Sequence, residues 1–252
     1  MFLSLRVPRI YWATLVAGLA IISSCSSPPP PAQARKSKLT THRHHTDDHK
    51  QPKHGAMTHR FEDADKWAKK FDDPKRDQWQ QPDQVVKALS LTPNMTVVDI
   101  GAGTGYFLPH LSHALGEKGH VIGLDIETSM VDYMAKRIKD SGLANASSKK
   151  GEPNDPLLAF NSIDRILVVD TWHHIQNRPA YVKKLYDGLK PNGMVAIVDF
   201  NKKSPIGPPK HHRLTPSQVQ SDFPESTWNV SEAKTTLPYQ FIVIAQKQQN
   251  QE

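Results

Sequence analysis

Short apolar runs alternate with amphipathic segments after residue 60 of the chain. Runs of β-branched and aliphatic residues cover positions 97–100, 121–124, 163–169 and 194–200, and continuously apolar runs of this length suit strands that are buried on both faces of a parallel sheet. Residues 129–140 and 178–189 carry apolar side chains at helical spacing, with their polar side chains on the other face. This alternation predicts an α/β fold with a mostly parallel sheet.

The remaining elements have weaker patterns. A third strand just before Lys149 is poorly marked, whereas residues 228–236 and 240–246 indicate a closing antiparallel hairpin. Before the first strand, Trp67, Phe71 and Trp79 favour one or two amphipathic helices that break near Pro74 and Pro82. We expect these helices either to pack on the sheet edge or to shape a binding pocket.

The first strand runs directly into a glycine turn in the stretch VVDIGAGTGYF, residues 97–107. Gly101, Gly103 and Gly105 allow a sharp turn and a close approach of the backbone to a ligand. Asp99 lies two residues before the first glycine. Dinucleotide-binding folds use G-x-G-x-x-G, with the last glycine one position later, so the spacing disfavours an NAD-dependent oxidoreductase.

The G-x-G-x-G spacing with its preceding acid resembles motif I of the class I S-adenosylmethionine (SAM)-dependent methyltransferases. The resemblance covers roughly residues 57–246 and includes the turn L-K-P-x-G at residues 189–193. It implies a three-layer Rossmann-like fold with a seven-stranded sheet, SAM as cofactor, and a role for Asp99 in holding the amino-acid end of SAM above the glycines. The structural alternative is a glycine-rich turn without a ligand.

Further acids follow the next strands. Asp125 ends the second strand, where a carboxylate can accept hydrogen bonds from ribose hydroxyls; its alternative role is to cap the following helix. The resemblance implies that an acid just after the third strand contacts the adenine amino group. Glu152 and Asp155 are both candidates, or both belong to a solvated turn, and the sequence does not choose between them.

Two histidines follow the fourth strand at the edge where substrates bind in open α/β folds. His173 or His174 could take a proton from an acceptor, or one could cap a turn while the other packs. Asp170 and Trp172 border the same edge; Asp170 is a further candidate for the cofactor site, and we expect Trp172 to offer a stacking surface. After the fifth strand, the loop residues His211, His212 and Arg213 are candidates for the lining of the acceptor pocket.

Charge is unevenly distributed along the chain. The net charge is +7, and residues 1–60 contain nine Lys/Arg against two Asp/Glu, whereas residues 61–252 contain 23 of each sign. The basic character therefore belongs to the N-terminal region. A folded domain with balanced charge argues against nucleic acid as the substrate.

The N-terminus has the pattern of a secretory signal. Two arginines precede a thirteen-residue apolar run at positions 10–22, and the following ISSC resembles a bacterial lipobox ending at Cys25, the only cysteine. Residues 1–24 are thus predicted to be a signal peptide, with an incidental cysteine as the alternative. We expect lipid on Cys25 to anchor the chain to a bacterial membrane, on the periplasmic side; if the signal is not used, the protein is cytoplasmic.

Residues 25–60 are rich in Pro, Lys and His with little apolar content, which predicts a disordered tether. Its histidines lack the spacing of a structural metal site, so no metal is predicted. We place the methyltransferase domain at 61–246 and a polar tail at 247–252. The function predicted is transfer of a methyl group from SAM to a small-molecule acceptor. The alternative is an exported binding module, because SAM is made in the cytoplasm. The acceptor, the methylated atom and the oligomeric state are not specified by the sequence.

Overall fold

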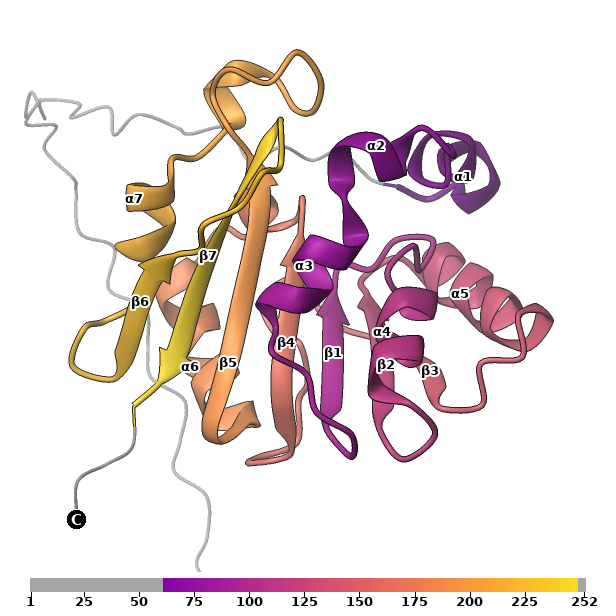
Figure 1. The fold of residues 1–252 in the computed structure, drawn as a ribbon, viewed down its shortest axis with the longest axis horizontal. Helices are drawn as coiled ribbons and strands as arrows, with labels where there is room; N and C mark the ends of the chain where they lie inside the picture. The colour runs from indigo at the N-terminus through magenta and orange to yellow at the C-terminus, as the bar shows by residue number, and fades with distance from the viewer. Residues whose placement is uncertain (1–60, 249–252) are drawn as a thin grey trace, which may run out of the picture. The chain divides into compact units, whose positions relative to one another are not determined.

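The computed structural model of the chain describes residues 61–248, and the predicted signal peptide, Cys25 and tether lie outside this part. A seven-stranded sheet runs through the described residues in the order β3-β2-β1-β4-β5-β7-β6 (Figure 1). The first five strands are parallel, while β7 is antiparallel to both β5 and β6. The expected mostly parallel sheet with an antiparallel C-terminal hairpin is confirmed.

The strands are β1 (Thr96–Ile100), β2 (His120–Asp125), β3 (Ala146–Lys150), β4 (Ile163–Val169), β5 (Leu189–Phe200), β6 (Trp228–Glu232) and β7 (Gln240–Lys247). The α-helices are α1 (Ala64–Phe71), α2 (Arg76–Gln80), α3 (Pro82–Ala88), α4 (Leu108–Leu115), α5 (Thr128–Asp140), α6 (Arg178–Gly188) and α7 (Pro216–Gln220). Two short 3-10 helices are η1 (Trp172–His174) and η2 (Lys210–His212).

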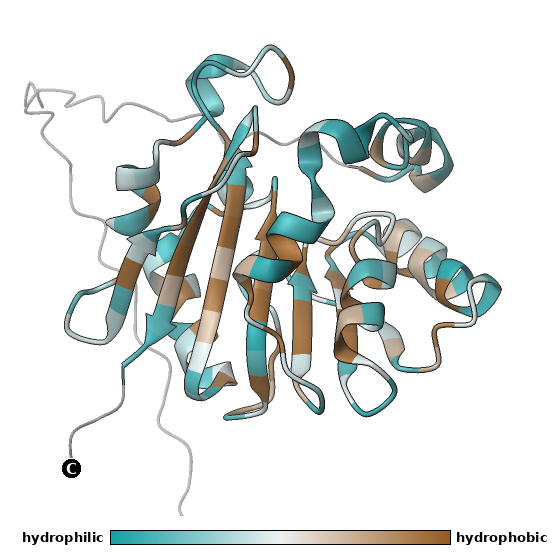
Figure 2. Cartoon of the chain, in the orientation of Figure 1, coloured by the Kyte–Doolittle hydropathy of each residue, from teal (hydrophilic) through white to brown (hydrophobic). Residues whose placement is uncertain are grey.

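Helices cover both faces of the sheet, which gives three layers. Side chains of α3, α4 and α5 pack with one apolar cluster of the sheet, and side chains of α6 and α7 pack with the other. Figure 2 shows this as brown central strands, with α1 and α2 mostly teal. Because consecutive parallel strands end at one edge, the loops after β1, β2, β4 and β5 meet there.

Several boundaries differ from the sequence expectations. The N-terminal region forms three helices rather than one or two, because Pro82 starts a helix of its own and Gln81 before it has a positive φ of 44°. Strand β5 begins at Leu189 instead of Met194, since Leu189 already pairs with Ile163 across a register shift in β4. Strand β7 extends to Lys247, the first residue of the predicted polar tail.

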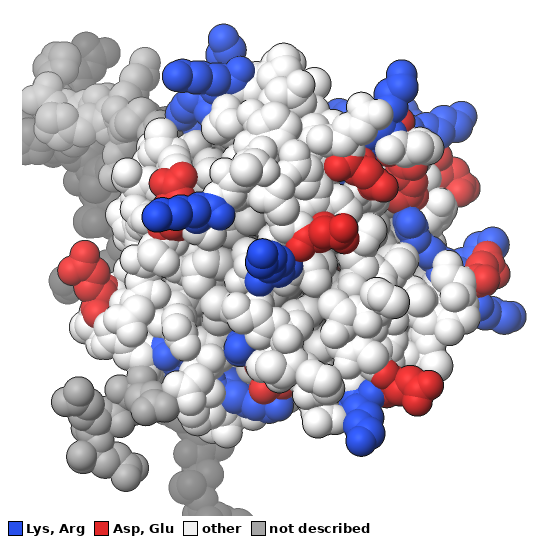
Figure 3. Space-filling view, in the orientation of Figure 1, with Lys and Arg blue, Asp and Glu red and all other residues white. Residues whose placement is uncertain are grey.

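Charged side chains of both signs are interspersed over most of the face in Figure 3. A group of blue side chains without red neighbours lies at the top, left of centre, over the loop that joins β5 to α7. Among the described residues, no helix is long and apolar enough to cross a membrane.

Candidate active site

The glycine turn after β1 is held by main-chain hydrogen bonds to the end of β2. The N–H groups of Gly101 and Ala102 both donate to the carbonyl of Leu124, at 2.7 and 3.0 Å. Gly101, Gly103 and Gly105 have φ angles of +72°, +57° and +79°, which side chains with a Cβ rarely adopt. A Cβ at Gly101 would lie 2.3 Å from the hydroxyl of Thr171, so this glycine is required by packing as well as by conformation.

Asp125 is tied to the same turn. Its carboxylate accepts hydrogen bonds from the N–H of Gly103 and from the N–H of Glu127, both at 2.9 Å. The second bond fixes the turn before α5. It does not cap the helix, because the N-cap residue is Glu127 and α5 has no side-chain cap hydrogen bond. Each carboxylate oxygen has a further lone pair, and therefore the side chain can still accept hydrogen bonds from a ligand.

Three carboxyl groups gather at this edge of the sheet with raised pKa values. Burial raises the pKa of Asp99 to about 7, helped by the charge of Asp125. Burial also raises the pKa of Asp170 to about 7 and raises the pKa of Asp125. Carboxylates that are hard to ionise in an apolar site favour a cationic ligand, since a positive charge stabilises their ionised form. They disfavour the pyrophosphate of a dinucleotide, because its negative charge would repel the ionised carboxylates.

The guanidinium of Arg76 is the nearest compensating charge. It lowers the pKa of both Asp99 and Asp170 and lies 3.9 Å from the ring centre of Tyr106. Its Nε and Nη2 donate to the side-chain oxygen of Gln80 at 3.2 and 3.1 Å. The N-terminal helices therefore contribute charge to the site rather than only packing on the sheet edge.

A hydrogen-bonded chain connects Arg76 to Asp170 across three elements. Because a guanidinium can only donate, the oxygen of Gln80 faces Arg76 and its amide N–H donates to Gln240 at 2.5 Å. Gln240 in turn donates to Asp170 at 2.7 Å. Gln80 and Gln240 are both buried. Sequence reasoning missed this chain, although Gln240, as a polar residue at the start of an apolar strand, offered a signal.

Helix α1 lies across the glycine turn. Asp72, just after α1, accepts hydrogen bonds from Thr104 at 2.9 Å and from Arg137 at 2.7 Å. The ring of Phe71 lies 3.4 Å from the position that a Cβ on Gly103 would take. The segment is thus anchored on the turn by an ion pair and by a ring contact.

An aromatic cluster extends from this contact to the two histidines. Trp67 stacks on Phe71 with ring centres 5.4 Å apart, and Phe61 lies 5.9 Å from Phe71. Phe61 also meets His174 edge-on at 6.0 Å. The structure therefore brings η1 and the glycine turn to the two ends of one aromatic surface.

His173 is paired with Asp199, at the end of β5. Its Nδ1 lies 2.9 and 3.0 Å from the two carboxylate oxygens of Asp199, and both side chains are almost completely buried. Burial lowers the pKa of His173, but the hydrogen bond and charge of Asp199 outweigh burial, so the pKa lies above its usual value. The sequence analysis did not single out Asp199; an acid ending the apolar run MVAIVDF was the available signal.

The two candidates after β3 have different surroundings. Asp155 forms an ion pair with Lys184 on α6 and accepts from the N–H of Leu157, and Lys184 lowers its pKa. Glu152 is exposed and adjoins Gly151, whose N–H donates to the carbonyl of Asp125. The arrangement gives the side chain of Asp155 a structural partner, whereas Glu152 bonds to Asp155 through its main chain and has an exposed side chain.

Two sequence interpretations are wrong. Trp172 is fully buried, stacks on Phe223 and donates to Asp222 at 2.9 Å, so it belongs to the core rather than to the substrate-binding edge. Arg213 is also buried and donates to four carbonyl oxygens of its own loop, so it organises the loop instead of lining a pocket.

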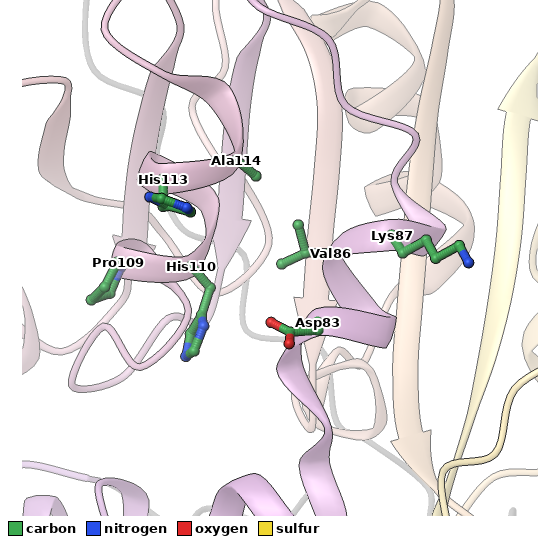
Figure 4. Close-up of a pocket in the computed structure, with 7 residues that line it drawn as sticks. All are labelled: Asp83, Val86, Lys87, Pro109, His110, His113 and Ala114. Atoms are coloured by element: carbon green, nitrogen blue, oxygen red, sulfur yellow. The ribbon is translucent and has the colours of Figure 1, made fainter.

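A separate groove of about 380 Å³ lies between α3 and α4. Figure 4 shows Asp83 from α3 and His110 from α4 on opposite sides of it, with Val86 between the helices. Burial lowers the pKa of His110. The lining contains none of the predicted site residues, and the groove is therefore distinct from the edge where the strands end.

The chain is similar to known methyltransferases in sequence and in structure. A family profile described as a methyltransferase domain matches residues 91–251. A crystal structure of a SAM-dependent methyltransferase from Aquifex aeolicus has 32% sequence identity and a TM-score of 0.68, covering 73% of this chain and 98% of that one. The chain thus belongs to the methyltransferase domain family and is a class I SAM-dependent methyltransferase.

Curated relatives share part of the chain. Ubiquinone/menaquinone biosynthesis C-methyltransferases from Shewanella sp. (strain W3-18-1) and Vibrio cholerae are 30% and 28% identical over 119 and 111 residues. The matches cover 46% and 44% of this chain and 47% and 43% of those proteins, so the chain spans about half the length of these relatives. A phosphoethanolamine N-methyltransferase from Haemonchus contortus, solved with SAM, has 14% identity and a TM-score of 0.56, covering 68% of this chain and 53% of that one; it shares the fold.

SAM is the cofactor of this class, and the residues at the sheet edge fit it. The cofactor carries a sulfonium and an ammonium group, and three carboxyl groups with raised pKa values lie at this edge of the sheet. The glycines keep side chains away from the backbone that a ligand approaches. The comparisons support an enzyme and give no support to the alternative of a non-catalytic binding module.

Proposed function

We propose that this methyltransferase acts on a small-molecule acceptor whose proton is taken by His173. The observation that carries the proposal is the buried pair of His173 and Asp199. The ring of His173 lies 4.3 Å from that of His174, where the aromatic surface that begins over the glycine turn ends. The names of the curated relatives add support, because they describe methylation of carbon in quinone biosynthesis. Methylation of a ring carbon is easier when a base removes the proton of a hydroxyl group on that ring. A base beside aromatic side chains fits such a reaction.

The chemistry divides between cofactor and protein. Bound SAM supplies an electrophilic methyl group on a sulfonium that is already a good leaving group. Asp199 holds Nδ1 of His173, so Nε2 is the nitrogen that accepts a proton from the acceptor. Asp199 then stabilises the imidazolium that forms. The aromatic side chains of α1 and His174 orient a flat acceptor and exclude water.

We further propose roles for Asp99, Asp125 and Glu152 at the cofactor site. Asp99, buried below the turn, faces the ammonium group at the amino-acid end of SAM. Asp125 accepts hydrogen bonds from ribose hydroxyls with its remaining lone pairs, and Glu152 rather than Asp155 contacts the adenine amino group. Ile126, which is 45% exposed beside Asp125, offers apolar surface to the adenine ring.

Replacing Asp125 by Ala is expected to weaken SAM binding by roughly tenfold to a hundredfold, because charge-assisted hydrogen bonds of about 1.5–3 kcal/mol are lost. The free energy of unfolding should fall by only about 1 kcal/mol as the N–H groups of Gly103 and Glu127 lose their acceptor. Calorimetric titration with SAM and with NAD, and denaturant unfolding of the same samples, measure both effects.

Asp125→Asn is the control, since it keeps the shape and one acceptor oxygen and should lose less affinity. Equal SAM affinity in the wild-type chain and in Asp125→Ala would refute the ribose assignment. Binding of NAD but not of SAM by the wild-type chain would refute the proposed function.

We also propose that the chain is exported and anchored by lipid on Cys25, which lies outside the described residues. The support is the ISSC sequence after an apolar run of signal-peptide length. Cys25→Ser is expected to abolish labelling by radioactive palmitate while the SAM affinity stays unchanged. Wild-type protein that takes up no label in a bacterial host would exclude the anchor.

A further inference from the structure

The loop between β5 and α7 concentrates positive charge at the sheet edge. Residues 201–221 contain three lysines, one arginine and two histidines and no aspartate or glutamate, although residues 61–252 as a whole are balanced in charge. Lys202, Lys203, Lys210 and His211 are exposed. The group of blue side chains at the top of Figure 3 lies over this loop, as comparison with Figure 1 shows.

The loop has a defined conformation. The guanidinium of Arg213 donates to the carbonyls of Pro208 at 2.8 Å, Ser204 at 2.6 Å and Ile206 at 2.9 Å, and more weakly to Asn201 at 3.3 Å. These bonds close residues 201–213 around one buried cation. The exposed lysines are therefore presented from a fixed loop rather than from a random coil.

The basic loop adjoins the proposed acceptor site. It begins directly after β5, whose last residues include the Asp199 that holds His173. The rings of His211 and His212 are tilted to each other with centres 4.1 Å apart, and burial, then the charges of His211 and His173, lower the pKa of His212. The exposed side chains of the loop thus form the rim of the proposed acceptor site, while Asp170 and Asp199 lie deeper in that site.

Within the described residues, the exposed lysines of this loop have no carboxylate partner. Within residues 61–248, no carboxylate forms an ion pair with Lys202, Lys203 or Lys210. The ammonium of Lys202 donates to the carbonyl of Arg213, which leaves Lys203 and Lys210 as the cations available to a ligand. Two other exposed lysines, Lys136 and Lys183, each pair with an aspartate one helical turn away.

We propose that Lys203 and Lys210 bind an anionic group, such as a carboxylate, on the methyl acceptor. This inference rests on the proposed function and specifies its substrate class: a flat molecule whose reacting end lies near His173 and whose anionic end lies at the rim. The separation of charges supports that orientation, because Asp170 and Asp199 would repel an anion placed deeper in the site.

The test compares two probes that differ only in charge, 2-naphthoate and 2-naphthamide. Each is titrated by ligand-observed NMR into the full chain saturated with S-adenosylhomocysteine. The wild-type chain is expected to bind the naphthoate more tightly than the naphthamide. The double variant Lys203→Gln/Lys210→Gln should lose roughly threefold to tenfold in naphthoate affinity, as expected for two exposed ion pairs, with less than about a twofold change for the naphthamide.

Lys136→Gln/Lys183→Gln is the matched control, because it removes the same net charge from other surfaces and should keep the wild-type affinity for both probes. An equal loss in the control, or equal binding of the two probes by the wild-type chain, overturns the inference. Binding of phosphatidylglycerol vesicles that needs Lys203 and Lys210, with naphthoate affinity unaffected by their substitution, would make the loop a membrane surface instead. SAM affinity is measured in parallel. A wild-type chain that binds no SAM would show that the proposed function itself fails.

Discussion

Replacing His173 by Asn is expected to lower the turnover number by about a hundredfold to ten-thousandfold, the usual range for loss of a general base. Asn keeps an N–H that can donate to Asp199, so the buried carboxylate retains a partner and the fold is preserved. Affinity for SAM should stay within about threefold of the wild type, because His173 is placed at the acceptor end of the aromatic surface. Methyl transfer from tritium-labelled SAM to a panel of hydroxylated aromatic probes, beginning with catechol, provides the rate.

The pH dependence separates a base from a structural histidine. Only the neutral imidazole accepts a proton, so the rate should rise with pH and level off above the pKa of His173. Because Asp199 holds that pKa above its usual value, the acid limb should lie above about pH 6.5. Asp199→Asn removes the charge that stabilises the imidazolium, and the acid limb should move to lower pH as the maximal rate falls.

NMR titration of nitrogen-15-labelled histidine gives the same pKa without any acceptor. A His173 pKa that does not fall in Asp199→Asn would contradict the pairing. An unchanged turnover number in His173→Asn, with wild-type SAM affinity, would assign His173 to a purely structural role.

Gly101→Ala is expected to abolish measurable SAM binding and to lower the free energy of unfolding by roughly 2–5 kcal/mol. A positive φ costs an alanine about 1–2 kcal/mol, and overpacking adds about 1–3 kcal/mol, since the new Cβ would lie 2.3 Å from the side chain of Thr171. The turn must shift to relieve the contact, which moves its N–H groups away from Leu124. Denaturant unfolding and calorimetric titration with SAM measure the two effects.

Gly142→Ala separates the conformational cost from the steric one. Gly142 has a φ of +63° with open space around its Cβ position, and it follows the end of α5, so alanine there should cost about 1–2 kcal/mol without changing SAM affinity. The same loss of stability in both variants, or SAM binding by Gly101→Ala at the wild-type level, would show that the close packing of the turn does not matter for the cofactor.

The order of strands and helices could be predicted from sequence because burial on both faces leaves a continuous apolar run, as in β1, β4 and β5. The glycine turn could be predicted because its backbone conformation excludes most other residues. Element boundaries were less predictable. Pairing of Leu189 with Ile163 and a separate helix beginning at Pro82 depend on neighbours that no local pattern encodes.

The proposed roles of Asp99 and Asp125 rest on fixed spacing within one strand and its turn, which a sequence displays directly. Partners from distant strands were not visible. Asp199 meets His173 only because β5 lies beside β4 in the sheet, and Gln240 reaches Asp170 only because β7 returns antiparallel along β5. Trp172 shows the opposite error. Its position after β4 predicted a side chain exposed at the substrate-binding edge, whereas packing against Phe223 buries it.

The class of fold, the glycine turn and the positions of the acids beside it could be predicted from the chain alone, because they follow from local conformation and from the period of burial. Three-dimensional packing was needed to show which histidine has a carboxylate partner, which acid after β3 is engaged by a lysine, and which arginine closes the basic loop. Each of those outcomes depends on side chains far apart in the chain or on the folding of a loop around one cation. A hydrogen bond forms only between atoms a few ångströms apart. The spacing of residues in the sequence predicts such short distances only within single helices, strands and turns.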